Sequence, residues 1–226
     1  MNLSVGAPEG AGLMIVPFKH GPFWNFSYLL ICSVTREAVV IDPAWEVASI
    51  LVEAAKHEAR IGSIILTHGH GDHVHGTGAI VSATGASVVV HEAELPELRR
   101  SYDGPVEAIA AGIETSIGTG QMRLLPTPGH TKGSISVLTS GNLFTGDALH
   151  VGALGRLGAD PGALQSAWRT VDSVLRGLPD NTLIRPGHDA GPSPSSMLGE
   201  ERARLPALRA RSFRVFEHEV NSAWRA

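Results

Sequence analysis

The sequence has one cysteine, few aromatic residues and no excess of positive charge. A single cysteine, Cys32, excludes an intrachain disulfide and a cysteine-based zinc site. Cys32 follows the apolar run 28–31, which indicates a thiol buried in a strand rather than a nucleophile. The formal net charge of -4 argues against a nucleic-acid partner, because such proteins usually present a basic face.

Long apolar runs are also missing. No run is long enough to cross a bilayer, and no basic-then-apolar leader opens the sequence. We therefore expect no membrane partner and, by default, a cytoplasmic location. The length of 226 residues and the apolar content favour one globular domain over residues 1–226. Residues 1–12 are expected to form a loose N-terminal arm, and residues from about 195 to 226 a helical tail.

Short apolar runs alternate with segments of helical spacing along the chain. Most of the expected strands are apolar throughout, which indicates burial of both faces. Two sheets facing each other with helices outside would provide that burial. The expected strands are 13–18, 26–33, 38–41, 63–66, 87–90, 113–117, 122–126, 134–139, 142–145 and 182–184, and the expected helices are 46–60, 72–83, 91–100 and 161–176.

A cluster of histidine and aspartate comes directly after the apolar run 64–66. It contains His68, His70, Asp72 and His73, separated by glycines that allow a tight backbone. Neutral imidazole and carboxylate are ligands that suit zinc, iron or manganese. The density of such groups at a strand end predicts a metal site rather than a polar surface loop.

Three further candidates share one local pattern: each follows a glycine at the end of an expected strand. They are His130, Asp147 and His188. Each alone is better explained as a turn residue, but four such strand ends in one chain, counting the first cluster, favour one shared site.

This set of residues in this order resembles the five-motif pattern of the metallo-β-lactamase fold superfamily, with Asp42 at the first motif. The resemblance implies an α+β fold, a four-layer αβ/βα sandwich of two mixed β-sheets face to face with helices outside. It also implies two divalent metal ions, with zinc expected, although the ligand types leave iron and manganese open. The implied ligands are His68, His70 and His130 for one ion, Asp72, His73 and His188 for the second, and Asp147 as the bridge.

Within the superfamily, the stretches 146–149 and 186–189 are similar to the glyoxalase-II (hydroxyacylglutathione hydrolase) and persulfide dioxygenase group. The pair Gly155-Arg156 fits the same group and makes Arg156 a candidate substrate contact. Asp147 stands where β-lactamases of this fold usually have cysteine, which disfavours antibiotic hydrolysis. His70 stands where flavin-linked di-iron members have glutamate, which disfavours that branch.

The expected activity is hydrolysis of a thioester, or a related ester or lactone, in a small-molecule substrate. Two ions that share a water lower its pKa from ~16 to near neutral and so generate a hydroxide nucleophile. Asp72 is the expected catalytic proton carrier. The alternative is a mononuclear iron persulfide dioxygenase with His68, His130 and Asp147 as its triad, and a non-catalytic metal-binding protein is less favoured.

Three residues near these motifs have two interpretations each. Asp42 is either a turn residue or a group that orients a metal ligand. Trp24 either covers the substrate or packs within its loop. His150 either lines the pocket as an acid or hydrogen-bond donor or faces solvent. The sequence does not indicate an oligomeric state.

Overall fold

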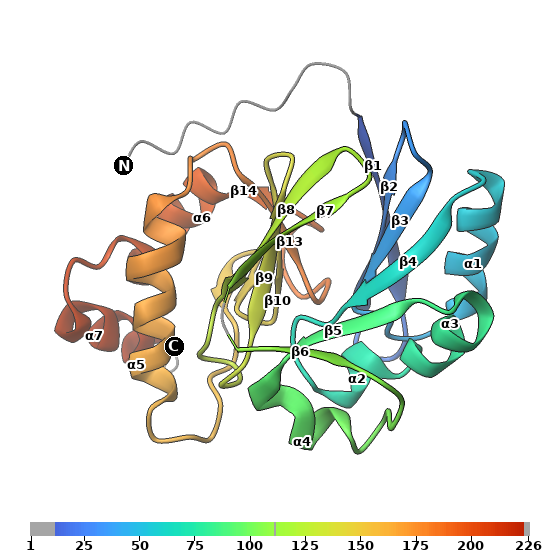
Figure 1. Cartoon of the computed structure of the whole chain (residues 1–226). Helices are drawn as coiled ribbons and strands as arrows, with labels where there is room; N and C mark the ends of the chain where they lie inside the picture. Colours follow the sequence, from blue (N-terminus) through green and yellow to red (C-terminus); the bar gives the residue numbers. More distant parts are fainter. Residues whose placement is uncertain (1–11, 111, 224–226) are drawn as a thin grey trace.

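Two six-stranded sheets lie face to face, with helices on the outer side of each (Figure 1). The computed structural model describes residues 12–110 and 112–223. Apart from residue 12, the expected N-terminal arm lies outside the described residues. Helices α1 to α4 cover the sheet formed by the first half of the chain, and α5 to α7 cover the other (Figure 1). The expected four-layer α+β arrangement is confirmed.

The first sheet has its strands in chain order, antiparallel from β1 to β3 and parallel from β3 to β6. Because β3, β4 and β5 are parallel, their carboxyl ends meet at one edge of the sheet. Asp42 follows β3 and His68 follows β4, so both are placed at this edge. The strands are β1 (Leu13–His20), β2 (Asn25–Cys32), β3 (Glu37–Ile41), β4 (Arg60–Ile65), β5 (Ser87–His91) and β6 (Glu107–Ile109).

The second sheet has the order β14-β13-β10-β9-β8-β7 and is antiparallel except for β10 and β13. A separate two-stranded hairpin follows β10. The sheet strands are β7 (Ile113–Ile117), β8 (Gly120–Pro126), β9 (Ile135–Thr139), β10 (Asn142–Gly146), β13 (Leu183–Pro186) and β14 (Ser196–Met197), and the hairpin strands are β11 (Leu149–His150) and β12 (Ala153–Leu154).

The helices are short, and within the described residues none is both long and apolar enough to cross a membrane. They are α1 (Val47–Lys56), α2 (Gly71–Val74), α3 (Thr77–Thr84), the 3₁₀ turn η1 (Glu92–Glu94), α4 (Leu95–Leu98), α5 (Ala163–Arg169), its π and 3₁₀ extensions η2 (Thr170–Val174) and η3 (Leu175–Gly177), α6 (Leu198–Arg204), the 3₁₀ turn η4 (Pro206–Arg209) and α7 (Phe213–Ala223).

The core lies in three layers: one between the two sheets and one beneath each layer of helices. Strand β2 is buried at every position, so its side chains enter two of these layers. Its Tyr28 ring meets the Phe144 ring of β10 edge to face, with centroids 4.8 Å apart. This two-sided burial explains why the strand reads as a continuous apolar run rather than an alternation.

Several expected boundaries differ from the structure. The expected helix 72–83 is two helices, because Gly76 lies against the Pro43 carbonyl and separates them. The expected helical tail begins with β14 and is interrupted at Leu205, whose extended backbone precedes Pro206 and ends α6. Strands β6, β11, β12 and β14 have two or three residues each, too few to show a periodic pattern.

Candidate metal centre

All seven candidate ligands meet at the edge where the strands of both sheets end. His68 and His70 follow β4, and Asp72 and His73 begin α2. The second sheet supplies the other three from the loops after β8, β10 and β13, namely His130, Asp147 and His188. The loop after β4 is joined to β9 by a bond from the Ile135 N–H to the Thr67 carbonyl, 2.8 Å long. The site is therefore built across both sheets.

Three imidazoles converge in the first donor group, which is His68, His70 and His130. His70 Nδ1 lies 3.1 Å from His68 Nε2 and 3.0 Å from His130 Nε2. One proton on His70 cannot satisfy both neighbours, so nitrogen lone pairs face one another. Ligand atoms at about 2.1 Å from a tetrahedral zinc ion stand about 3.4 Å apart, which is close to this spacing.

The other ring nitrogen is occupied in two members of this group. His130 Nδ1 donates to the Arg156 carbonyl at 2.6 Å. His68 Nδ1 donates to the Thr67 hydroxyl at 3.1 Å, because that hydroxyl gives its own proton to Asp42. Burial lowers the pKa of both imidazoles, of His68 most strongly. Both are therefore neutral with an unprotonated Nε2 directed into the site, as a metal ligand requires.

The second donor group is Asp72, His73 and His188. The two Nε2 atoms are 3.1 Å apart, and Asp72 Oδ2 lies 3.7 Å from that of His73 and 3.5 Å from that of His188. Burial by itself would lower the pKa of both histidines, but Asp147 raises both, and Asp42 adds to the effect on His73. Both histidines therefore bind protons more tightly than burial alone would allow.

Asp147 lies between the two groups. Its Oδ2 is 3.5 Å from His130 Nε2 and 3.3 Å from His188 Nε2. Its Oδ1 is buried and lies 3.4 Å from His73 Nε2, but it makes no well-aligned hydrogen bond with the described residues. Burial would raise the pKa of Asp147, but His73 and His188 hold it well below its usual range. An ionised carboxylate with a free buried oxygen between two donor groups fits a dinuclear metal site.

Asp42 has the contacts of an orienting group rather than of a simple turn residue. Its Oδ1 accepts the Thr67 N–H at 2.7 Å, and its Oδ2 accepts the Thr67 hydroxyl and His73 Nδ1–H at 2.6 and 3.0 Å. His73 Nε2 is thereby turned towards the site. His188 is held in the same way by the Phe23 carbonyl, 2.8 Å from its Nδ1.

Close approach at Gly187 makes room for the centre. A Cβ at this position would lie 2.5 Å from Asp147 Oδ1 and 2.7 Å from His73 Cε1. Gly146, directly before Asp147, has a φ of +48°, and a Cβ at this position would lie 2.3 Å from Thr67 Oγ1. The glycines that directly precede Asp147 and His188 are thus required here by space or by backbone conformation.

Two buried polar residues near the ligands had no signal in the sequence. The Asn25 amide donates to Asp72 Oδ2 at 2.9 Å and accepts from Trp45 Nε1 at 3.2 Å. Glu94 accepts backbone N–H groups from two ligand-bearing loops. Neither belongs to a spaced cluster of ligand types, so only burial with a specific partner reveals them.

Trp24, His150 and Arg156, the candidate substrate contacts, lie around this centre. Trp24 is 62% exposed, and its carbonyl accepts the Asp189 N–H beside His188. His150 stands on the β11–β12 hairpin with its ring centroid 5.8 Å from that of His188. Its Nδ1 is buried without a partner among the described residues, and burial lowers its pKa. Arg156 contacts His130 through its carbonyl, while its side chain is exposed.

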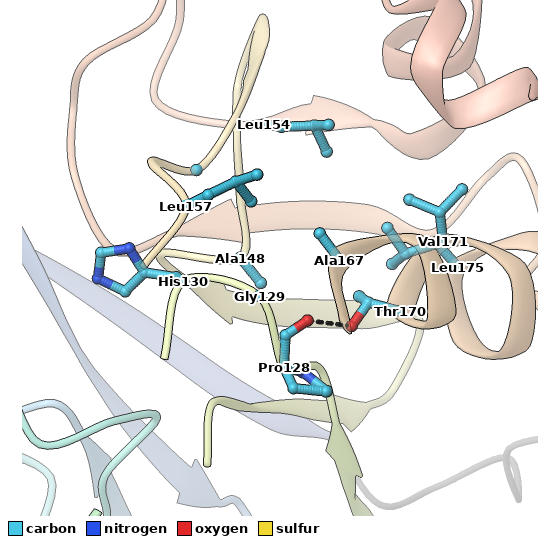
Figure 2. Close-up of a pocket in the computed structure, with 11 residues that line it drawn as sticks. Pro128, Gly129, His130, Ala148, Leu154, Leu157, Ala167, Thr170, Val171 and Leu175 are labelled. Atoms are coloured by element: carbon cyan, nitrogen blue, oxygen red, sulfur yellow. Dashed lines mark hydrogen bonds between the residues drawn. The ribbon is translucent and has the colours of Figure 1, made fainter. Parts of the chain in front are cut away.

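A small cavity lies behind the loop that carries His130, beneath α5 and its extension (Figure 2). The Thr170 hydroxyl closes one side by donating to the Pro128 carbonyl at 2.7 Å (Figure 2). Its volume of about 10 Å³ is room for about one water molecule, so it is no substrate pocket. It is lined mainly by apolar groups, including Leu154, Leu157, Ala167, Val171 and Leu175.

Known proteins resemble this chain in sequence and in structure. It is 37% identical over 171 residues to the hydroxyacylglutathione hydrolase of Nitrosococcus oceani, which covers 73% of the chain and 62% of that protein. ETHE1 from Myxococcus xanthus superposes with a TM-score of 0.80 at 31% identity, over 92% of this chain and 90% of its own. TTHA1623 in a di-iron-bound form superposes with a TM-score of 0.71 at 28% identity, over 84% of this chain and 98% of its own.

These similarities support the glyoxalase-II and persulfide dioxygenase group expected from the motifs. The di-iron form of one structural neighbour agrees with the two donor groups found here. The family model of the metallo-beta-lactamase superfamily matches residues 21–188, a span that begins before Trp24 and ends at His188. The chain therefore belongs to the metallo-beta-lactamase superfamily.

Proposed function

We propose that the protein is a dinuclear metal-dependent hydrolase that cleaves a thioester, or a related ester or lactone, as glyoxalase-II-like enzymes do. The observation that carries the proposal is the position of Asp147, which contacts both donor groups. Two divalent ions, zinc by preference, would supply an activated water nucleophile and polarise the carbonyl under attack. The proposed ligands are His68, His70 and His130 for one ion, Asp72, His73 and His188 for the other, and Asp147 for both.

Asp72 is the proposed proton carrier. The Asn25 amide holds its Oδ2, which leaves Oδ1 free of hydrogen bonds with the described residues. The side chain is one-quarter exposed, so it reaches the open side of the site while it remains next to His188. A carboxylate oriented in this way takes the proton of the attacking water at Oδ1 and delivers it to the leaving group.

The part of the substrate that does not react is proposed to contact residues around the opening of the metal site, which we call the rim. Phe23 and Trp24 are 61% and 62% exposed beside His188 and offer apolar surface to the group that does not react. His150, on the neighbouring hairpin, is a proposed hydrogen-bond donor to the substrate. The exposed Arg156 guanidinium is proposed as a weaker contact at the same rim.

Glutathione is only one of the carriers to be tested. The chain spans 62% of the length of the hydroxyacylglutathione hydrolase to which it was compared. Two arginines of the tail are used in internal contacts: Arg202 with Asp180 and nearby carbonyls, and Arg204 with Glu201. A carrier without glutathione's two carboxylates therefore belongs in the substrate panel.

Metal content and hydrolysis test the proposal together. Protein purified without chelator is analysed for metal per chain, then assayed with a hydroxyacyl thioester of glutathione, a thioester lacking glutathione, and a lactone. We expect two ions per chain and turnover of at least one thioester, and we expect His130→Ala to lose the first ion and the turnover. Two bound ions without hydrolysis of any of these substrates would contradict the proposal and favour a non-catalytic metal-binding protein.

A mononuclear iron persulfide dioxygenase is the second candidate, and the similarity to ETHE1 from Myxococcus xanthus favours it. Its triad would be His68, His130 and Asp147, the last two 3.5 Å apart. The complete second donor group has no role in this candidate, which is why we place it second. One iron per chain, with oxygen uptake on addition of glutathione persulfide, would establish it in place of the hydrolase.

A further inference from the structure

Glu94 is a buried carboxylate outside the proposed ligand set. It lies in the 3₁₀ turn η1 after β5 and is 3% exposed. Its Oε2 accepts the Gly69 N–H at 2.8 Å, and its Oε1 accepts the Gly133 N–H at 2.8 Å. Each oxygen of one side chain is therefore used by a different loop.

These two loops carry the first donor group. Gly69 stands between His68 and His70, after β4 of the first sheet. Gly133 is three residues beyond His130, in the loop between β8 and β9 of the second sheet. Because the two loops belong to opposite sheets, the distance between their histidines depends on contacts across the site.

Glu94 is packed closely against both glycines, which leaves its side chain little room to move. A Cβ on Gly133 would lie 2.7 Å from Glu94 Oε1, and a Cβ on Gly69 would lie 3.0 Å from the Glu94 carbonyl oxygen. An ionised carboxylate is only an acceptor, so it satisfies two inward-directed N–H groups at once, with charge-assisted bonds. A metal site tolerates little displacement of its ligands, so bonds that fix the loops also fix the site.

We propose that Glu94 is a positioning residue that sets the separation of the His68–His70 loop and the His130 loop, and through it the metal affinity of the first donor group. The inference rests on the proposed function, since it takes His68, His70 and His130 as ligands. The second group is oriented by other residues, namely Asn25, Asp42 and the Phe23 carbonyl. Loss of Glu94 therefore acts on one of the two ions.

The test is the zinc affinity of Glu94→Gln, measured by competition with a chromophoric chelator. Glutamine can accept from only one N–H, and its own amide N–H then meets the other as donor against donor. We expect one of the two zinc affinities to fall about 10–100-fold, the range found when a group that supports metal ligands is removed. The other affinity should change by less than about threefold, since its orienting contacts stay intact.

Glu201→Gln is the matched control. Glu201 is likewise buried and accepts a glycine N–H, that of Gly152, at 2.7 Å, but it contacts neither ligand-bearing loop. It should lower the melting temperature of the metal-free protein and leave both zinc affinities unchanged. Equal zinc loss in both variants would make the effect one of general stability and overturn the proposal.

Glu94→Asp serves if the glutamine variant does not fold. The shorter carboxylate keeps its charge but reaches only one of the two N–H groups, so the same direction is expected. Two unchanged affinities in the folded variant would overturn the role of Glu94. Absence of zinc binding by the wild-type protein would instead overturn the proposed function, so the two failures are distinguishable.

Discussion

The two donor groups of this protein contain similar residues in different electrostatic surroundings. In the first group, burial lowers the pKa of His68 and His130 and leaves them neutral. In the second group, Asp147 raises the pKa of His73 and His188 despite their burial. Protons would therefore compete with a cation for the second group at a higher pH than for the first. Position relative to one carboxylate thus decides how a histidine behaves.

The largest expected effect comes from the residue that contacts both groups. Asp147→Asn removes the negative charge shared by His130 and His188, so we expect loss of at least one ion per chain. Turnover should fall by more than about 100-fold, since removing a mere supporting contact already costs about 10–100-fold. Metal analysis and kcat on the best thioester measure both. Asp160→Asn, at an exposed ion pair with Lys132, is the control. Two ions and full activity in the Asp147 variant would show that the groups are independent.

Gly187→Ala should weaken metal binding by the second donor group more than by the first. The added methyl would meet Asp147 Oδ1 and His73 Cε1 at 2.5 and 2.7 Å, so one of them must move. We expect about 10–100-fold weaker binding of one zinc ion. Gly177→Ala is matched to it, because a Cβ there meets nothing within 4 Å. Chelator competition measures the zinc affinities of both variants. Equal affinities would show that Asp147 and His73 can move to accommodate the methyl group without loss of binding.

Lowering the pH should weaken metal binding by the second donor group more than by the first. The raised pKa of His73 and His188 makes protons compete for the second group at a higher pH than for the first. As the pH falls towards 6.5, the ordinary histidine value, affinity there should already fall, by at most about tenfold per pH unit for each proton displaced, while the first changes less. In the metal-free protein the same raised pKa stabilises the fold at low pH, and this contribution is lost as pH rises through it. Zinc titrations at stepped pH give the two slopes, and parallel slopes would contradict the assignment.

The smallest effect is expected at Arg156. Its carbonyl holds His130 Nδ1, and a side-chain change leaves that carbonyl in place. Arg156→Ala should therefore keep both zinc affinities within about twofold, as exposed substitutions usually change a free energy by less than about 0.5 kcal/mol. A higher KM at unchanged metal content would assign the guanidinium to substrate binding. Loss of zinc would show that the side chain positions its own backbone.

Much of the centre could be predicted because ligand chemistry is local in the sequence. His68 to His73 form a dense cluster at a strand end, and His130, Asp147 and His188 each follow a glycine at a strand end. Buried apolar strands likewise indicate two packed sheets. The two-residue strands and the break before Pro206 were missed or misplaced, since such short elements depend on neighbours rather than on periodicity.

The sequence by itself determined which residue types are available to a metal, at which strand ends they stand, and that the strands are buried on both faces. Only the tertiary structure decided which nitrogen of each histidine faces inward and in which group the histidine pKa is raised. It alone showed Glu94 between Gly69 and Gly133, 25 and 39 residues away in the chain. The physical reason is that hydrogen bonds and burial act between atoms a few ångströms apart, and these atoms come from opposite sheets.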